Sequence, residues 1–143
     1  MYKYGECLSK YLLDTNTCVY LLNGNEILKR RVKEIGVYSL TISICALAEL
    51  YFGTYNSKRV EENLRRIDLF KKNLSILSDS EESAKLFGKI KADLRTKGTI
   101  IDDFDILIAR IANANSHILV TNNTDHVERI EGLRIQNWLN KNS

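Results

Sequence analysis

The sequence predicts an α/β protein, a three-layer α/β/α sandwich with a mostly parallel central sheet. Two observations predict this fold. Short apolar or β-branched runs, the length of buried strands, alternate along the chain with longer segments of helical periodicity. In addition, several of these runs end in polar or acidic residues that begin the next helix. Strands that are separated by helices pair in parallel, and the connecting helices cover both faces of the sheet.

The first half of the chain contains two strand-then-helix units. Residues 11–13 form a short apolar run that ends at Asp14, after which apolar residues recur at near-helical spacing. Residues 39–43 alternate and are β-branched, and residues 46–50 that follow are good helix formers. Gly53 looks like the stop of this second helix.

The second half continues the same alternation. Apolar residues spaced by three and four predict an amphipathic helix over residues 60–70, and a brief strand follows at residues 74–77. Residues 78–82 can cap the next helix, which ends at Gly98. Its inward face consists of Ala84, Phe87, Ile90 and Leu94. The remaining predicted elements are a strongly apolar helix opened by residues 102–105, a buried strand at 117–121 and an edge strand at 133–135.

Length and composition predict one domain over residues 1–143, with residues 1–10 as a short N-terminal extension. The chain is 44% hydrophobic and 27% charged, the balance of an ordinary globular protein. Its three cysteines, Cys7, Cys18 and Cys45, are odd in number and lack the close spacing of a zinc knuckle, so we expect a reducing cytoplasm. Cys18 and Cys45 lie among apolar residues, and we expect them to pack in the core. No segment has the length of a signal peptide or a membrane span, and we expect no membrane association.

Acidic residues occupy equivalent places in the predicted fold. Asp14 follows the first strand, Glu49 lies on the helix after the second, and Asp105 lies in the first turn of a later helix. Asn123, just after strand 117–121, lies at the same end of its strand. Because the carboxyl ends of parallel strands meet at one edge of a sheet, we expect these side chains to converge there.

Several carboxylates that are brought together repel one another unless a cation lies among them. Mg²⁺ and Mn²⁺ prefer oxygen ligands and often take the remaining ligands from water and substrate phosphate. Such an ion lowers the pKa of a bound water, a neighbouring carboxylate takes the proton, and the ion neutralises charge on the attacked phosphate. The acidic cluster therefore predicts metal-dependent phosphodiester cleavage.

Each acid also has a purely structural explanation. Asp14 can simply cap the helix that follows it, and at least one of Asp102, Asp103 and Asp105 is expected to be a cap. Glu49 can be a surface residue of an amphipathic helix. The histidines, His117 and His126, have no partner at metal-ligand spacing, so we expect no zinc site.

Four ordered motifs between about residues 12 and 138 resemble the PIN-domain toxins of the VapC type. They are LLDTN at 12–16, IS at 42–43 with AEL and Gly53 shortly after, the segment 98–109 around Phe104 and Asp105, and VTNNT at 120–124, which leads to Trp138. The resemblance implies Mg²⁺ or Mn²⁺ dependence and endoribonuclease activity against tRNA or another structured RNA. It also implies a homodimer and a cognate antitoxin that blocks the site.

Carried over by position, the resemblance makes Asp14 and Asp105 the principal metal ligands, with Glu49 completing an acidic triad. Asn123 takes a fourth place that holds an acid in many relatives, and Asp125 could supply the missing carboxylate. Asp103 is a further candidate ligand. The chain departs from the pattern at Ile100, a frequent proline, and at Asp102, a frequent glycine, which leaves open how the loop before Asp105 bends.

Two other functions compete with the nuclease. A non-catalytic RNA-binding or assembly module could keep the same fold, with Asn123 as the sign of a weakened metal site. The net charge of +3 permits a nucleic-acid partner but does not require one. A phospho-accepting receiver domain also clusters acids, but it needs a lysine after a late strand, where this chain has Thr121, Asn122 and Asn123.

Overall fold

A computed structural model describes residues 9–139 and contains one five-stranded sheet in the order β3-β2-β1-β4-β5. All four strand pairings are parallel. The strands are β1 (Tyr11–Leu13), β2 (Leu40–Ser43), β3 (Ser75–Leu77), β4 (Ile118–Val120) and β5 (Ile135–Gln136). Cys7 and most of the predicted N-terminal extension lie outside the described residues.

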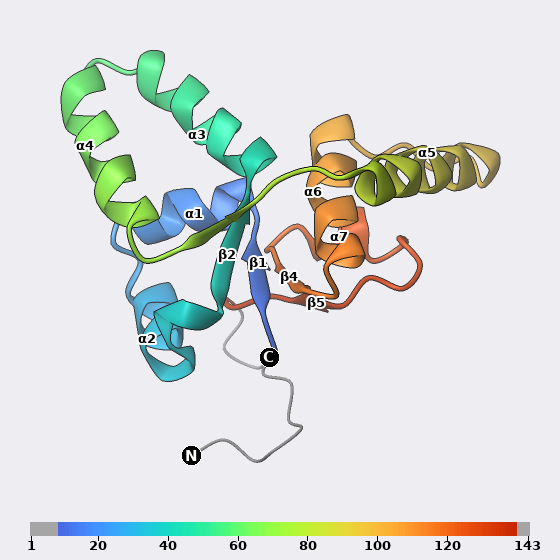
Figure 1. Ribbon diagram of the computed structural model, residues 1–143, viewed down its shortest axis with the longest axis horizontal. Coiled ribbons are helices and arrows are strands. Elements are labelled where there is room, and N and C mark those ends of the chain that lie inside the picture. Colours follow the sequence, from blue (N-terminus) through green and yellow to red (C-terminus); the bar gives the residue numbers. More distant parts are fainter. Residues whose placement is uncertain (1–8, 140–143) are drawn as a thin grey trace.

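Helices cover the sheet on both faces (Figure 1). Helices α1 to α4 lie on one side and α5 to α7 on the other, which confirms the predicted three-layer sandwich (Figure 1). Their bounds are α1 (Thr15–Leu22), α2 (Glu26–Ile35), α3 (Ile44–Tyr55), α4 (Val60–Lys71), α5 (Glu81–Thr96), α6 (Asp103–Ala114) and α7 (Thr124–Val127), with a 3₁₀ turn at Val37–Ser39.

The core is divided into two clusters by the central strands. Leu12 and Leu13 of β1 are both 0% exposed, and because successive side chains of a strand point to opposite faces they belong to different clusters. Leu12 packs with residues of α5 and α6, whereas Leu13 packs with residues of α1 to α4. Cys18 lies in the second cluster, and burial raises the pKa of its thiol, so it serves as core packing as predicted.

Two local predictions were wrong, and one helix was not predicted. Gly53 does not end its helix, because α3 continues to Tyr55 with Thr54 buried in the last turn. Residue Ser83, rather than Ala84, is the buried position in the first turn of α5. Helix α2 was not predicted, because most of its residues are charged and Leu28 is its one fully buried residue.

The described part of the chain contains no helix that is long and apolar enough to cross a membrane.

Candidate active site

Asp14 lies at the carboxyl end of β1, next to the carboxyl end of β4. Its backbone N–H donates to the carbonyl oxygen of Val120 at 3.0 Å, which fixes it between the two strands. Its Oδ1 accepts a hydrogen bond from the backbone N–H of Thr17 at 2.8 Å, so the predicted helix cap is confirmed. Among residues 9–139, no hydrogen bond reaches Oδ2, which leaves that oxygen available to a cation.

Asp105 enters the same region from the first turn of α6, with its side chain 33% exposed. Burial raises the pKa of its carboxyl, and the negative charges of Asp102 and Asp14 raise that pKa further. A hydrogen bond with His126 partly offsets the increase. Asp14 and Asp105, 91 residues apart in sequence, are therefore close enough to repel one another.

Glu49, on α3, is half-buried and is held by the residue that follows Asp14. The hydroxyl of Thr15 donates a 2.6 Å hydrogen bond to Oε1 of Glu49. Because Thr15 is the first residue of α1, this bond fastens the middle of α3 to the start of α1. The structure thus links Glu49 to the Asp14 segment, and Asp14 to Asp105.

The other predicted residues are placed differently. Asn123 is the N-cap position of α7, and its backbone N–H donates to the hydroxyl of Thr121 at 3.0 Å. Asp103 turns toward α5, where it forms a 2.9 Å ion pair with Lys91. Asp102 caps α6 by accepting from the backbone N–H of Phe104 at 2.9 Å, which confirms that one acid of this group is a cap. Asp125 is exposed.

No three Asp, Glu, His or Cys side chains within residues 9–139 are positioned as a complete metal site. Mg²⁺ does not require one, because it usually binds proteins through one or two carboxylates and keeps several waters or substrate oxygens. Asp14 and Asp105 offer such a pair, with like charges that a cation would neutralise. The donor chemistry of this edge therefore fits a hard divalent ion.

Sequence reasoning missed one residue here, His126. Its Nδ1 lies 3.4 Å from Oδ2 of Asp105, although 21 residues separate the two in sequence. In the sequence His126 has no partner at metal-ligand spacing, and its contact with Asp105 exists only in the folded chain. The signal that could have found it is its place one turn beyond the carboxyl end of β4, the same sheet edge as the acids.

Fold and site together define a class of protein: a parallel α/β sandwich with paired carboxylates at the carboxyl edge of its central strands. The sequence profile of the PIN domain matches residues 11–133. The chain belongs to the PIN-domain family.

Curated relatives cover almost the whole chain. Ribonuclease VapC2 of Rickettsia felis is 38% identical over 130 residues, which are 90% of this chain and 97% of the relative. Ribonuclease VapC2 of Haemophilus influenzae is 39% identical over 91% of this chain and 98% of its own length. The tRNA(fMet)-specific endonuclease VapC of Salmonella typhimurium is 34% identical over 90% of this chain and 98% of its own length.

Solved structures agree with these relatives. VapBC2 from Rickettsia felis, bound to a DNA fragment from its promoter, superimposes with a TM-score of 0.84 at 35% identity, covering 90% of this chain and 98% of the matched chain. DNA-bound VapBC from Salmonella typhimurium gives a TM-score of 0.86 at 34% identity, with coverage of 91% and 98%. The fold therefore matches over nearly the full length of both chains.

Proposed function

We propose that this protein is a metal-dependent endoribonuclease that acts as the toxin of a toxin–antitoxin pair. The observation that carries the proposal is that Asp14 and Asp105 lie at the carboxyl edge of the sheet, close enough for the charge of Asp14 to act on Asp105, in a PIN-domain chain whose relatives are named ribonucleases. The substrate would be RNA, and the name of the Salmonella relative supports tRNA as its class.

Asp14 and Asp105 would hold Mg²⁺ or Mn²⁺. When bound, the ion supplies an acidic water and charge neutralisation at the attacked phosphate. Glu49 is linked to the residue after Asp14 by the 2.6 Å hydrogen bond from the hydroxyl of Thr15, and we propose that its carboxylate accepts the proton of the attacking water. Asn123, at the same edge, would orient water or phosphate through its amide.

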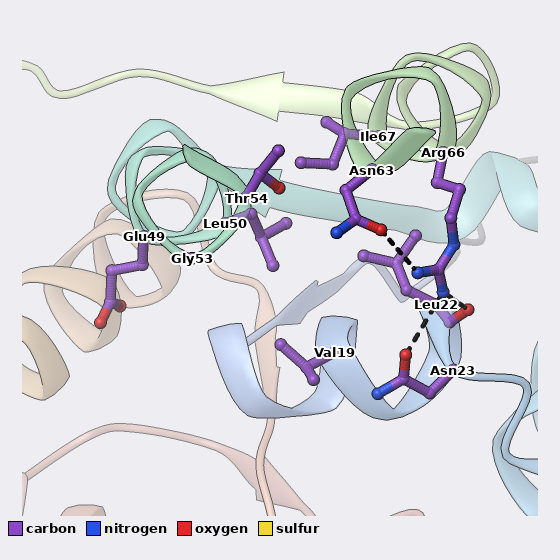
Figure 2. Close-up of a pocket in the computed structure, with 10 residues that line it drawn as sticks. All are labelled: Val19, Leu22, Asn23, Glu49, Leu50, Gly53, Thr54, Asn63, Arg66 and Ile67. Atoms are coloured by element: carbon purple, nitrogen blue, oxygen red, sulfur yellow. Dashed lines mark hydrogen bonds between the residues drawn. The ribbon is translucent and has the colours of Figure 1, made fainter. Parts of the chain in front are cut away.

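The partner proposed for the toxin is a cognate antitoxin, as the VapBC titles of the similar structures support. A cavity of ≈ 240 Å³ between α1, α3 and α4 suits it, with Glu49 at one end and Arg66 at the other (Figure 2). Arg66 reaches from α4 to the carbonyl oxygen of Leu22 and so closes its end of the cavity. Apolar side chains line the space between them, namely Val19, Leu22, Leu50 and Ile67. An apolar segment that ends in a cation would fill the cavity and block Glu49.

The other partner that we infer is a second copy of the chain. We propose that the protein acts in the cytoplasm, where RNA is available. Ile100, in the loop between α5 and α6, is 97% exposed, and Phe104, in the first turn of α6, is also exposed. A cavity of ≈ 400 Å³ lies along the same loop, lined by Leu94, Ile101 and Ile106 among others. A homodimer would remove this apolar surface from water. Light scattering of the purified chain measures its oligomeric state, and a monomer at micromolar concentration would contradict the homodimer.

RNA cleavage in Mg²⁺ or Mn²⁺ tests the proposed activity. We expect Asp14→Ala and Asp105→Ala each to lower cleavage by about 100-fold or more, since each removes a carboxylate that no neighbour replaces. Asp93→Ala, a change at an exposed carboxylate on α5, is the matched control and should cleave normally. Undiminished cleavage in both site variants would refute the site. RNA binding without cleavage by the unmodified protein would instead favour the non-catalytic module.

Substitution of the cavity wall tests the antitoxin surface. Val19→Asp places a charge in the apolar cavity without touching Asp14 or Asp105. We expect it to weaken binding of the protein encoded by the adjacent reading frame by about 100-fold while RNA cleavage persists, because a buried charge is costly. Leu69→Asp, on the exposed outer side of α4, is the control. Equal loss of antitoxin binding in both variants, or no loss in either variant, would refute this surface.

A further inference from the structure

The amino edge of the sheet, opposite the candidate active site, carries a group of basic side chains. Three neighbouring strands, β1, β4 and β5, are each preceded directly by a basic residue, namely Lys10, His117 and Arg134. We propose that these three residues, the basic edge, bind the phosphate groups of an RNA strand. The proposal rests on the proposed function for RNA as the occupant, but the basic edge lies apart from the acids of the candidate active site.

The pairing of the strands brings the three residues together. The backbone N–H of Ile118, the residue after His117, donates to the carbonyl oxygen of Lys10 at 2.9 Å. The guanidinium of Arg134 donates to the carbonyl oxygen of Ser116, the residue before His117, at 2.7 Å. The positive charges of Lys10 and Arg134 both act on the ring of His117. Because His117 precedes the middle strand of the three, its titratable ring lies beside two cations.

No carboxylate balances this charge within residues 9–139. The ion pairs of that part of the chain involve neither Lys10 nor Arg134, and both side chains are exposed. Burial lowers the pKa of His117, and the charges of Lys10 and Arg134 lower it further, while the backbone of Asn115 offsets part of the decrease. The basic edge thus has an excess of positive charge, which an anion would neutralise.

Exposed lysine and arginine side chains are usually solvated and bind nothing. A buried atom of the histidine ring favours a ligand here. Nδ1 of His117 is buried, and within residues 9–139 no hydrogen bond of normal length and angle reaches it. Buried polar atoms without a hydrogen bond are uncommon in folded proteins, and a bound ion is one explanation of such an atom. Since the charged neighbours of this ring are cations, the ion that fits is an anion.

An exposed aromatic residue beside the basic edge favours a nucleic-acid strand over a free anion. Nζ of Lys10 donates to the backbone carbonyl oxygen of Tyr38 at 3.0 Å, and Tyr38 is 89% exposed. Proteins bind single-stranded nucleic acids with cations that contact the phosphates and aromatic rings on which the bases stack. Lys10 and Arg134 would contact phosphates, and Tyr38 would stack on a base.

An NMR titration of the full chain tests the basic edge in EDTA, which removes the ion that the proposed cleavage needs. The ring C–H signals of His117 report its pKa, and the probe is an eight-nucleotide oligouridylate. Because bound phosphates neutralise the neighbouring cations, we expect the RNA to raise the pKa of His117 by about 0.5 or more. An unchanged pKa at saturating RNA would overturn the proposal. Inorganic phosphate at the same phosphate concentration should raise it much less, and an equal effect would overturn RNA as the occupant.

Removal of the two permanent charges gives a second readout. The double variant Lys10→Gln, Arg134→Gln should bind the same RNA about 10-fold more weakly in fluorescence anisotropy at low salt, because phosphate contacts are lost. The matched control is Lys85→Gln, Arg95→Gln, which removes the same charge from exposed positions of α5 that form no ion pair within residues 9–139. Equal weakening in the two double variants would show an effect of net charge alone and would overturn the proposal.

The basic edge and the nuclease activity can fail separately. If the metal-loaded protein cleaves RNA but RNA leaves the pKa of His117 unchanged, the basic edge is refuted and the nuclease stands. If RNA raises the pKa of His117 but the metal-loaded protein cleaves no RNA, the basic edge stands and the nuclease is refuted.

Discussion

At the scale of single residues, the carboxylate of Asp14 caps a helix with one oxygen and leaves the other oxygen available to a ligand. Oδ1 accepts the hydrogen bond from the backbone of Thr17, and this bond fixes the rotamer of the side chain. Oδ2 is then held in a defined direction with no hydrogen bond from residues 9–139. The cap therefore orients the proposed ligand, so the two explanations of Asp14 are compatible.

In the protein without metal, the charged form of Asp105 destabilises the folded state, because burial and the neighbouring negative charges disfavour that form. The pKa of this carboxyl is raised in the folded state, so its protonated form is favoured by folding, and stability is lost as the pH rises through the folded pKa. We expect Asp105→Asn to raise the Tm at pH 7 in EDTA by about 1–3 °C. The gain should vanish below the unfolded pKa of about 3.9, where both side chains are neutral.

Calorimetric scans of both proteins from pH 3 to pH 8 measure this difference. Asp93→Asn is a matched control, because Asp93 is an exposed carboxylate paired with Lys97 and lies outside the site. A lower Tm of Asp105→Asn than of the unmodified protein at pH 7 would contradict the account.

At the scale of elements, a buried arginine of α6 joins this helix to the segment that precedes α5. Arg110 of α6 is 7% exposed and forms an ion pair with Asp79, which precedes α5. The second oxygen of Asp79 accepts a 2.8 Å hydrogen bond from the hydroxyl of Ser83, and the guanidinium lies 5.2 Å from the ring centre of Phe87. This network fixes α6, and with it Asp105, against the start of α5.

We expect Asp79→Ala to destabilise the protein by about 1–3 kcal/mol, because it leaves the charge of Arg110 buried without its partner. The figure is below that of a fully buried pair, since the side chain of Asp79 is 42% exposed. Asp93→Ala removes a surface ion pair on α5 and should change stability by less than about 0.5 kcal/mol. Urea unfolding measures the free energy of unfolding of both variants. Equal stabilities would show that the Arg110 network stabilises the protein no more than a surface ion pair does.

The elements with strong periodicity could be predicted from sequence, and those that depend on distant contacts could not. The strands β1, β2 and β4 have short apolar or β-branched runs, so these strands and the acidic or amide residues that follow them could be predicted. Helix α2 depends on one buried anchor, Leu28, which a charged run hides. The contact of His126 with Asp105 depends on how α7 packs on α6, and no local pattern encodes that packing.

At the scale of the whole molecule, the parallel sheet is what gathers the site. β1 lies between β2 and β4, and the segments that follow these three strands carry Asp14, Glu49 and His126. Asp105 arrives on α6, the helix that leads into β4. Groups that lie up to 112 residues apart in sequence are thereby brought to one edge, where like charges accumulate and a cation is favoured.

Anomalous diffraction from crystals soaked in Mn²⁺ tests the central claim most directly. The account predicts one strong manganese peak within about 2.5 Å of carboxylate oxygens of both Asp14 and Asp105. The peak should disappear in crystals of the Asp105→Asn variant soaked in the same way. A strong peak elsewhere, or no peak beside Asp14 and Asp105 at saturating Mn²⁺, would contradict it.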